Sequence, residues 1–248
     1  MTLFAHQLRA EQLVFWRSRE AAVFIFIFPP MLFILLGSVY DGTIDGHPAP
    51  DVLLAGLLGY GIANTAFAGL TIQLVIRRES GVLKRLRATP LPQRTYLGAA
   101  LASTLTIFAV QFLTIFALGL VIFDVQLPSA WASLIVTAIV GVAAFAGIGL
   151  GAASLIRSAE GSSAVVNVIL LPMAFLSGSF GPTQDFPAFL QAIGDVLPLT
   201  YLIKALDAVY LDDEQVWQQL GSLAVLAGWG LAGLAVAVRR FGWEPRER

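Results

Sequence analysis

The clearest pattern in this 248-residue chain is the set of long stretches that lack charged residues. A helix needs about 20 consecutive uncharged residues to cross the hydrocarbon layer of a membrane. Six stretches of this kind occur, and each predicts one spanning helix. The expected spans are 21–40, 52–76, 96–123, 131–156, 162–180 and 216–238. The pattern therefore predicts an all-α membrane protein with six transmembrane helices.

The composition agrees with this prediction and excludes several other classes of protein. Apolar residues make up 57% of the chain and charged residues only 12%. The net charge of −1 provides no basic field to attract nucleic acid. Cysteine is absent, which excludes disulfides and thiol catalysis. Because the six spans use most of the chain, we expect residues 1–248 to form a single transmembrane domain.

The distribution of positive charge predicts how the chain is oriented. All but one of the 15 Lys and Arg residues fall in 1–20, in 77–94, at Arg157 or after 238. The exception is Lys204, which lies on the other side among most of the acidic residues. Positive loops stay on the cytoplasmic side of a membrane. Both termini are therefore predicted to be cytoplasmic, which agrees with an even number of spans.

The six spans contain no residue that could power transport by itself. No Asp, Glu, Lys, Arg or His lies inside them, whereas proton relays and intramembrane proteases need such groups. Neither Lys84 nor Lys204 follows a glycine, as a phosphate-binding loop requires. We therefore expect no catalytic residue, metal ligand or cofactor in this chain. If ATP is the energy source, ATP and Mg²⁺ are bound by a different protein.

One cytoplasmic segment, residues 77–97, combines basic and apolar residues in a helical pattern. A short helix is predicted over 79–89, with Ser80 capping its start and Pro90 ending it. Val82, Leu83 and Leu86 share one face of this helix. Two interpretations stay open, a positive loop resting on anionic lipid headgroups and a helix that docks onto a cytoplasmic partner.

The same segment resembles a family motif. Its residues match the pattern E-x-G-x-x-x-x-L-x-x-T-P found between spans two and three of ABC-2 type permeases. A second match lies in the fifth span and the outer loop, in the family order L-P, S-G, P, P and P-L-x-Y. The matching residues are Glu79, Gly81, Leu86, Thr89 and Pro90, and then Leu171, Pro172, Ser177, Gly178, Pro182, Pro187, Pro198, Leu199 and Tyr201. Within the family, the chain is most similar to daunorubicin-permease-like and Nod-factor-exporter-like members.

This resemblance implies a set of partners and a location. Such permeases form dimers, bind two separately encoded ABC ATPase subunits and lie in the plasma membrane of prokaryotes. The leader 1–20 would be an interfacial helix, and the segment after span two would be the coupling helix. The residues implied to couple to the ATPase are Glu79, Gly81, Val82, Leu83, Lys84, Arg85, Leu86, Arg87, Thr89 and Pro90, with Arg157 in a second, smaller contact.

The outer loop 181–214 is too apolar for a solvated linker and predicts two short helices. We expect a re-entrant helical hairpin between spans five and six, as the family also implies. It would act either as an outer gate or as a plain packing element. The candidate gate residues are Ser177, Gly178, Pro182, Pro198 and Tyr201. Lys204 and Asp207 lie three residues apart and are expected to pair.

Uncharged polar residues inside the spans are the candidates for lining a transport path. They are Asn64, Thr65, Gln73, Gln111 and Asn167. The competing interpretation, which we favour for each residue singly, is a hydrogen bond between or within helices. Gly147-x-x-x-Gly151 predicts a close helix–helix approach, and Pro29-Pro30 predicts a kink in the first span.

These observations predict the permease subunit of an ATP-driven exporter. The substrate would be an amphiphile such as a drug, a lipid or a glycolipid, because the path holds no fixed charge. A membrane scaffold or sensor that recruits a cytoplasmic protein is the alternative from another class. A secondary transporter or channel is disfavoured by the absence of ionisable groups in the spans.

Overall fold

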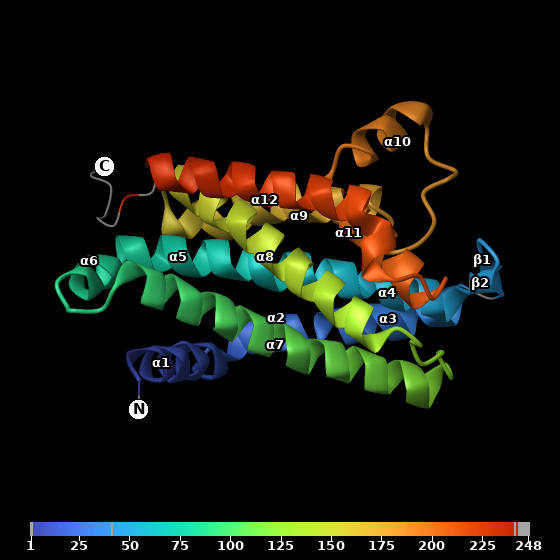
Figure 1. Cartoon of the computed structure of the whole chain (residues 1–248), viewed down its shortest axis with the longest axis horizontal. Coiled ribbons are helices and arrows are strands. Elements are labelled where there is room, and N and C mark those ends of the chain that lie inside the picture. Colours follow the sequence, from blue (N-terminus) through green and yellow to red (C-terminus); the bar gives the residue numbers. More distant parts are fainter. Residues whose placement is uncertain (1, 41, 241, 243–248) are drawn as a thin grey trace.

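The computed structural model describes residues 2–40, 42–240 and 242, so both ends of the predicted 1–248 domain lie partly outside the described residues. Within the described part, six helices are long and apolar enough to cross a membrane, as predicted. They lie roughly side by side along the long axis of the molecule (Figure 1). The first, Ala22–Val39, consists of α2 (Arg19–Phe26) and α3 (Phe28–Val39). The helix is interrupted at Ile27, just before Pro29 and Pro30, the residues that predict a kink in this span.

The second span runs from Ala49 to Glu79 and forms the centre of the bundle. It consists of α4 (Ala49–Ile62), a π-helical segment η1 (Ala63–Gly69) and α5 (Leu70–Glu79). A π segment inserts an extra residue into the helix and is often found at functional sites. Neighbouring helices surround this span, and 89% of its most apolar window is buried.

The remaining spans are single helices. They are α7 (Gln93–Ile122), α8 (Trp131–Leu155), α9 (Ala159–Leu176) and α12 (Leu220–Arg240), the last preceded by a short 3₁₀ turn, η2 (Val216–Gln219). Helix α8 packs along α12 through glycines, as expected from the Gly147-x-x-x-Gly151 pattern. A side chain on Gly151 would come within 2.6 Å of the Gly233 carbonyl oxygen. The fifth span begins and ends earlier than the predicted 162–180, since α9 begins at Ala159 and ends at Leu176, before a turn at Ser177–Gly178.

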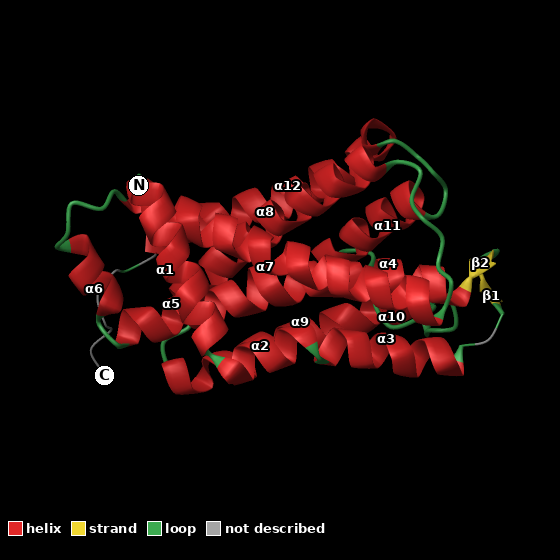
Figure 2. Ribbon diagram, turned by 90° about the horizontal axis from the view of Figure 1, so that it is seen from below, coloured by secondary structure: helices red, strands yellow, loops and turns green. Residues whose placement is uncertain are grey.

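Smaller elements lie at the two ends of the bundle (Figure 2). Helix α1 (Leu3–Arg17) and helix α6 (Val82–Arg87) occupy one end. A two-stranded hairpin, β1 (Thr43–Ile44) and β2 (His47–Pro48), lies at the other. Two short helices, α10 (Ala188–Gly194) and α11 (Pro198–Tyr210), lie at the same end as the hairpin and are bent by 82° relative to each other. This bent pair between spans five and six confirms the expected helical hairpin.

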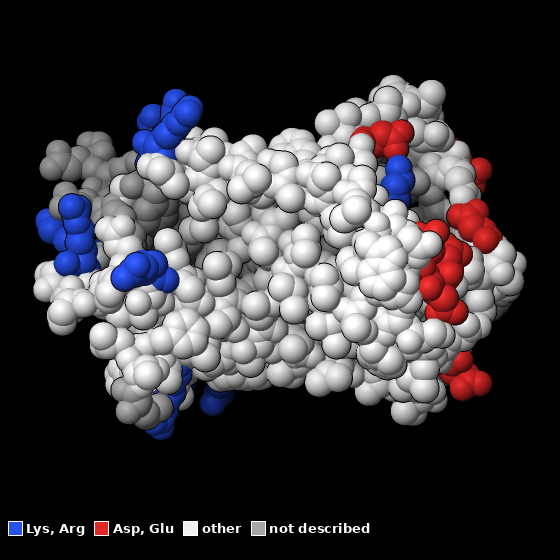
Figure 3. Space-filling view, viewed as in Figure 1, with Lys and Arg blue, Asp and Glu red and all other residues white. Residues whose placement is uncertain are grey.

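The two ends differ in charge. On the face shown in Figure 3, Lys and Arg gather at the end that carries α6, and Asp and Glu gather at the opposite end. The separation seen in the sequence is therefore a separation in space. Which side of the membrane each end faces stays a prediction.

Candidate functional site

The candidate coupling helix, α6, is shorter than predicted and begins differently. Gly81 adopts a left-handed conformation with φ +70° and separates α6 from α5. Ser80 does not cap α6. Its hydroxyl instead donates to the carbonyl oxygen of Arg77 at 3.3 Å, which closes the preceding helix. The predicted range 79–89 is therefore wrong at its start, because the turn at Gly81 moves the first helical residue to Val82.

The faces of α6 show which residues a partner could reach. Lys84, Arg85 and Arg87 are exposed. Leu83, by contrast, has no exposed surface and belongs to the main core of the chain. The expectation that Leu83 fills a groove on a partner is therefore wrong, since it fills the space beneath α6. Val82 and Leu86 are half-buried, so both keep some surface for a partner.

The end of α6 is fixed by the motif residues Thr89 and Pro90, both of which are exposed. The Thr89 hydroxyl donates to the Leu86 carbonyl at 2.6 Å and accepts from the Leu91 amide at 3.4 Å. A threonine at this position thus ends the helix, and the following proline prevents its continuation.

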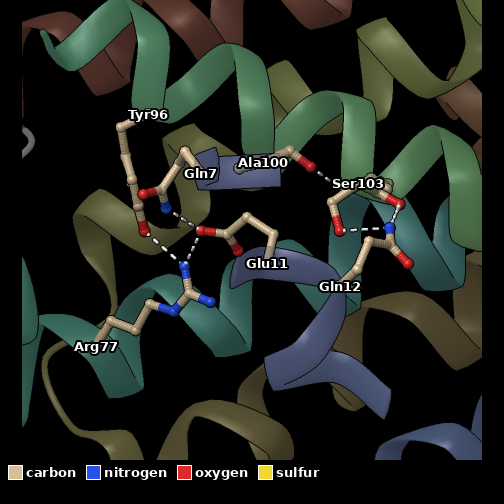
Figure 4. A network of polar contacts seen from close by, with 8 residues as sticks. Gln7, Glu11, Gln12, Arg77, Tyr96, Ala100 and Ser103 are labelled. Atoms are coloured by element: carbon tan, nitrogen blue, oxygen red, sulfur yellow. Dashed lines mark hydrogen bonds and ion pairs between the residues drawn. The ribbon is translucent and has the colours of Figure 1, made fainter. Parts of the chain in front are cut away.

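A buried polar network joins α5, close to α6, to the N-terminal helix α1 and to α7 (Figure 4). Arg77 Nη1 lies 2.7 Å from Glu11 Oε1 and 2.9 Å from the Tyr96 hydroxyl. Gln7 donates to the same Glu11 oxygen at 2.8 Å. Glu11 is only 2% exposed. Gln7 lies four residues before Glu11, so the two side chains share one face of α1, and this spacing is the local sequence signal of a polar contact here.

The next two residues of span two, Arg78 and Glu79, also make contacts within the chain. The Arg78 guanidinium donates to the carbonyl oxygens of Ala153 and Ile156, at the end of α8. Glu79 Oε2 accepts from the Ala159 amide at 2.9 Å, at the start of α9. Arg157, the second implied contact, is exposed in the turn between these two helices. Glu79 thus has a structural partner of its own.

The candidate path residues fall into two groups. Thr65 and Asn167 hydrogen-bond along their own helices, to the carbonyl oxygens of Gly61 at 2.8 Å and Ser163 at 2.9 Å. Such hydrogen bonds within a helix are what we expect if these residues stabilise helices and do not line a path. Gln73 and Asn167 are half-buried, so part of each side chain lies at the bundle surface.

The other candidates lie deep inside the bundle. Asn64 in η1 is 4% exposed and Gln111 in α7 is 1% exposed. Gln111 packs against Gly61, about one turn before Asn64, and a side chain on Gly61 would come within 3.2 Å of the Gln111 amide group. Within the described chain, Asn64 Nδ2 and both amide atoms of Gln111 have no hydrogen-bond partner. Any path that these two residues line would therefore open inside the bundle of one chain.

The predicted gate residues lie close to α4, the half of span two that is farther from α6. A side chain on Gly56 would come within 2.8 Å of the Ser179 carbonyl oxygen, so the turn after α9 packs directly on α4. Gly178 supplies the turn with φ +83°. The Ser177 hydroxyl lies 2.9 Å from the Thr200 hydroxyl, which joins α9 to α11. Pro198 begins α11.

The remaining gate candidates are half-buried, and one predicted pair in this region is wrong. Pro182 and Tyr201 keep part of their surface. Lys204 Nζ lies 3.2 Å from Asp195 and not beside Asp207, because the bend between α10 and α11 brings Asp195 within reach. Burial, together with the charges of Asp212 and Asp45, raises the pKa of the Asp207 carboxyl to about 7.

Comparison with known proteins agrees with the motif analysis. The family model described as "ABC-2 type transporter" matches residues 2–211. A protein of Bacillus subtilis (strain 168) named as a transport permease, YvfS, is 24% identical over 200 residues, which cover 80% of this chain and 81% of that protein.

Two further relatives carry more specific names. YbhR of Escherichia coli (strain K12), named as a multidrug ABC transporter permease, is 25% identical over 68% of this chain. The linearmycin resistance permease protein LnrN of Bacillus subtilis (strain 168) is 25% identical over 70% of this chain. The alignments cover 47% of each of these two relatives, so the chain spans about half their length.

Proposed function

This chain belongs to the ABC-2 type transporter family, and we propose that it is the membrane subunit of an exporter that moves an amphiphilic compound out of the cell. Family membership implies a multi-pass transport permease with an ABC ATPase as its partner. Export, an amphiphilic substrate and the cytoplasmic position of both termini are the finer parts of the proposal. ATP and Mg²⁺ would be bound by the partner ATPase.

The observation that carries the proposal is the exposed cationic face of α6 at the end of the central span. Lys84, Arg85 and Arg87 are exposed on a helix of six residues that follows span two after a two-residue turn. A rigid helix in this position can transmit a displacement, whereas a loop resting on lipid does not need rigidity. Val82 and Leu86 would supply the apolar part of the contact, and complementary acidic groups on the ATPase would supply the rest.

The substrate class is argued from the absence of charge in the spans and from two relatives. Their printed names refer to multidrug transport and to linearmycin resistance. An apolar path with isolated amides, such as those of Asn64 and Gln111, suits a neutral or amphiphilic compound better than an ion. Two copies of the chain would form the transporter, with Gln73 and Asn167 as candidates for the surface between them.

A charge-reversal variant tests the docking surface. In Lys84→Glu/Arg85→Glu/Arg87→Glu, all three changes lie on exposed positions, so folding should be preserved. We expect the full-length variant to retain about a tenth or less of the ABC ATPase that co-purifies with the wild type, identified by its Walker motifs. Phe189→Asp, an exposed apolar position at the other end of the molecule, is the control.

Leu86→Asp tests the apolar part of the same contact, with melting temperature measured alongside because Leu86 is half-buried. In proteoliposomes, neutral amphiphiles should stimulate the ATPase activity of the wild-type complex and should not stimulate that of either α6 variant. If both variants bind the ATPase normally and transport normally, the assignment of α6 is wrong. Recruitment of a cytoplasmic protein other than an ATPase, with no transport, would support a scaffold in place of an exporter.

A further inference from the structure

The last two residues of span two carry opposite charges and meet two different helix ends. Arg78 is 1% exposed, and its Nη1 and Nη2 lie 2.8 Å and 2.5 Å from the carbonyl oxygens of Ala153 and Ile156. These carbonyls belong to the last turn and the C-cap of α8. Glu79 accepts a hydrogen bond from the amide of Ala159, the first residue of α9.

The order of these charges matches the electrostatics of the helix ends. The last turn of a helix has free carbonyl groups and a partial negative charge, which a guanidinium stabilises. The first turn has free amide groups and a partial positive charge, which a carboxylate stabilises. Arg78 meets the C-terminus of a 25-residue helix, and Glu79 meets the N-terminus of an 18-residue helix. Reversing the order of the two charges would place each one against a helix end of its own sign.

The turn held in this way is short and carries an exposed cation. Only residues 156–158 separate α8 from α9, and Arg157 in their middle is exposed. On the other side of the Arg78–Glu79 pair, only Ser80 and Gly81 separate span two from α6. The pair therefore stands between two exposed cationic elements, the turn with Arg157 and the helix α6.

We propose that Arg78 and Glu79 are positioning residues that fasten the 156–158 turn to the end of span two. Arg157 and the cationic face of α6 then form one composite docking surface that moves as a single body. The identity of the partner, an ABC ATPase with a complementary acidic surface, rests on the proposed function. The fastening itself is a property of this chain and can be tested without any partner.

The first experiment measures the fastening in the chain alone. The chain has no cysteine, so spin labels can be attached uniquely to Ala88→Cys and Ser163→Cys, both at exposed positions. In lipid nanodiscs, the distance distribution between the labels should be narrow in this background. Glu79→Ala should broaden the distance distribution, because the fraction of molecules in which the 156–158 turn is detached from span two should rise about fivefold. This is the typical effect of losing a helix cap. Glu79→Gln keeps an oxygen that can accept from Ala159 and should stay narrow.

Arg78→Met should broaden the same distribution, and its melting temperature shows whether it folds. Because Arg78 is buried and this variant can fail to fold, the exposed Glu79 position decides the outcome. Equally narrow distributions in Glu79→Ala and Glu79→Gln would overturn the proposal. A distribution that is already broad in the unsubstituted background would overturn it as well.

The second experiment asks whether the two cationic elements act as one surface. Arg157→Glu should weaken association with the co-purifying ATPase about three- to fivefold at low ionic strength. In the Glu79→Ala background the same change should have little effect, because the turn is no longer held beside α6. Glu79→Gln should restore the full effect, which a purely structural role of Glu79 would not predict.

An equal effect of Arg157→Glu in all three backgrounds would overturn the composite surface. If the wild-type chain binds no ATPase at all, the proposed function fails, and the distance measurement still decides whether Arg78 and Glu79 fasten the turn. The two failures are therefore distinguishable.

Discussion

The two ends of span two, the central helix of the bundle, differ in how many charged side chains bind them to neighbouring helices. At the end near α6, three consecutive charged residues contact four other helices. Arg77 contacts α1 and α7, Arg78 contacts the end of α8, and Glu79 contacts the start of α9. At the opposite end, one oxygen of Asp51, Oδ1, accepts hydrogen bonds from the backbone amide of Gln126 at 2.9 Å and from the Tyr210 hydroxyl at 2.8 Å.

This difference indicates where the span can move relative to its neighbours. A displacement of α6 should be passed to α1, α8 and α9 together, because separating them requires breaking several charge-assisted bonds. At the other end, α4 also packs on α11, for example through Gly59 against Ile203, but its charge-assisted bonds to α11 and to the loop after α7 are those of the Asp51 carboxylate. The candidate gate turn at Ser179 packs on the same half of the span, against Gly56. We therefore expect the α6 end to act as a rigid junction and the opposite end to be the one that opens.

The largest effect is expected from breaking the ion pair at the rigid end. Glu11→Ala removes the carboxylate from Arg77, whose side chain is only 12% exposed, and leaves a nearly buried charge without its counter-ion. Breaking such a pair costs about 3–5 kcal/mol of the free energy of unfolding. Denaturation in detergent micelles measures it, with the exposed Glu160→Ala as control. Equal stabilities of the two variants would show that the network does not hold α1.

A smaller loss is expected at the opposite end. Asp51→Ala removes the acceptor from the Gln126 amide and from the Tyr210 hydroxyl, and should cost about 2–3 kcal/mol. Asp51→Asn keeps the oxygen and should lose less than Asp51→Ala. Accelerated hydrogen exchange in α11 and in the loop after α7, with none in α1, would locate the effect. Exchange that increases equally in α1 would contradict the separation of the two ends.

The fold was predictable from sequence because membrane-spanning helices depend on local composition. Runs without charge identify the six helices directly. Pro29-Pro30 predicted a kink close to the observed break at Ile27, and Gly147-x-x-x-Gly151 predicted a close approach to another helix without identifying it as α12. The bent pair α10–α11 followed from apolar segments too short to span. In each case the information lies within about 30 consecutive residues, which is the length of a spanning helix.

The candidate site was less predictable because its contacts join distant residues. Glu11 and Arg77 are 66 positions apart, and Glu79 and Ala159 are 80 apart. No local pattern identifies such partners. The orientation of α6 was also missed, because one left-handed residue, Gly81, shifts the helix start and turns Leu83 inward. The partner of Lys204 was also missed. Lys204 pairs with Asp195 and not with Asp207, because the bend between α10 and α11 brings Asp195 close to it.

A still smaller loss is expected where the gate turn meets α11. The Thr200 hydroxyl lies 2.6 Å from the Gly194 carbonyl oxygen and 2.9 Å from the Ser177 hydroxyl, and all three groups are buried. Thr200→Val keeps the shape of the side chain and removes both bonds, which should cost about 1–2 kcal/mol. Thr200→Ser keeps the hydroxyl and is the matched control. If valine and serine give the same melting temperature, these bonds do not fasten the candidate gate turn to α11.

The smallest effect is a pH dependence confined to the hairpin of α10 and α11. The pKa of Asp207 is raised from 3.8 to about 7, first by burial and then by the charges of Asp212 and Asp45. Because the folded state holds this proton more tightly than the unfolded state, the contribution to stability is full below about pH 4. It falls as the pH rises toward 7 and is constant above that value.

Asp207→Asn should therefore flatten the fall in melting temperature between pH 4.5 and 7.5 and should be more stable than the wild type at pH 7.5. The slope should stay below about 1 kcal/mol per pH unit, since Asp207 keeps part of its surface. Asp213→Asn, at an exposed position, is the control. Parallel pH profiles for wild type and Asp207→Asn would show that this carboxyl is not the titrating group. A flattened profile, with the junction at Arg77, Arg78 and Glu79 unaffected, would place the pH-sensitive part of the molecule at its less firmly held end.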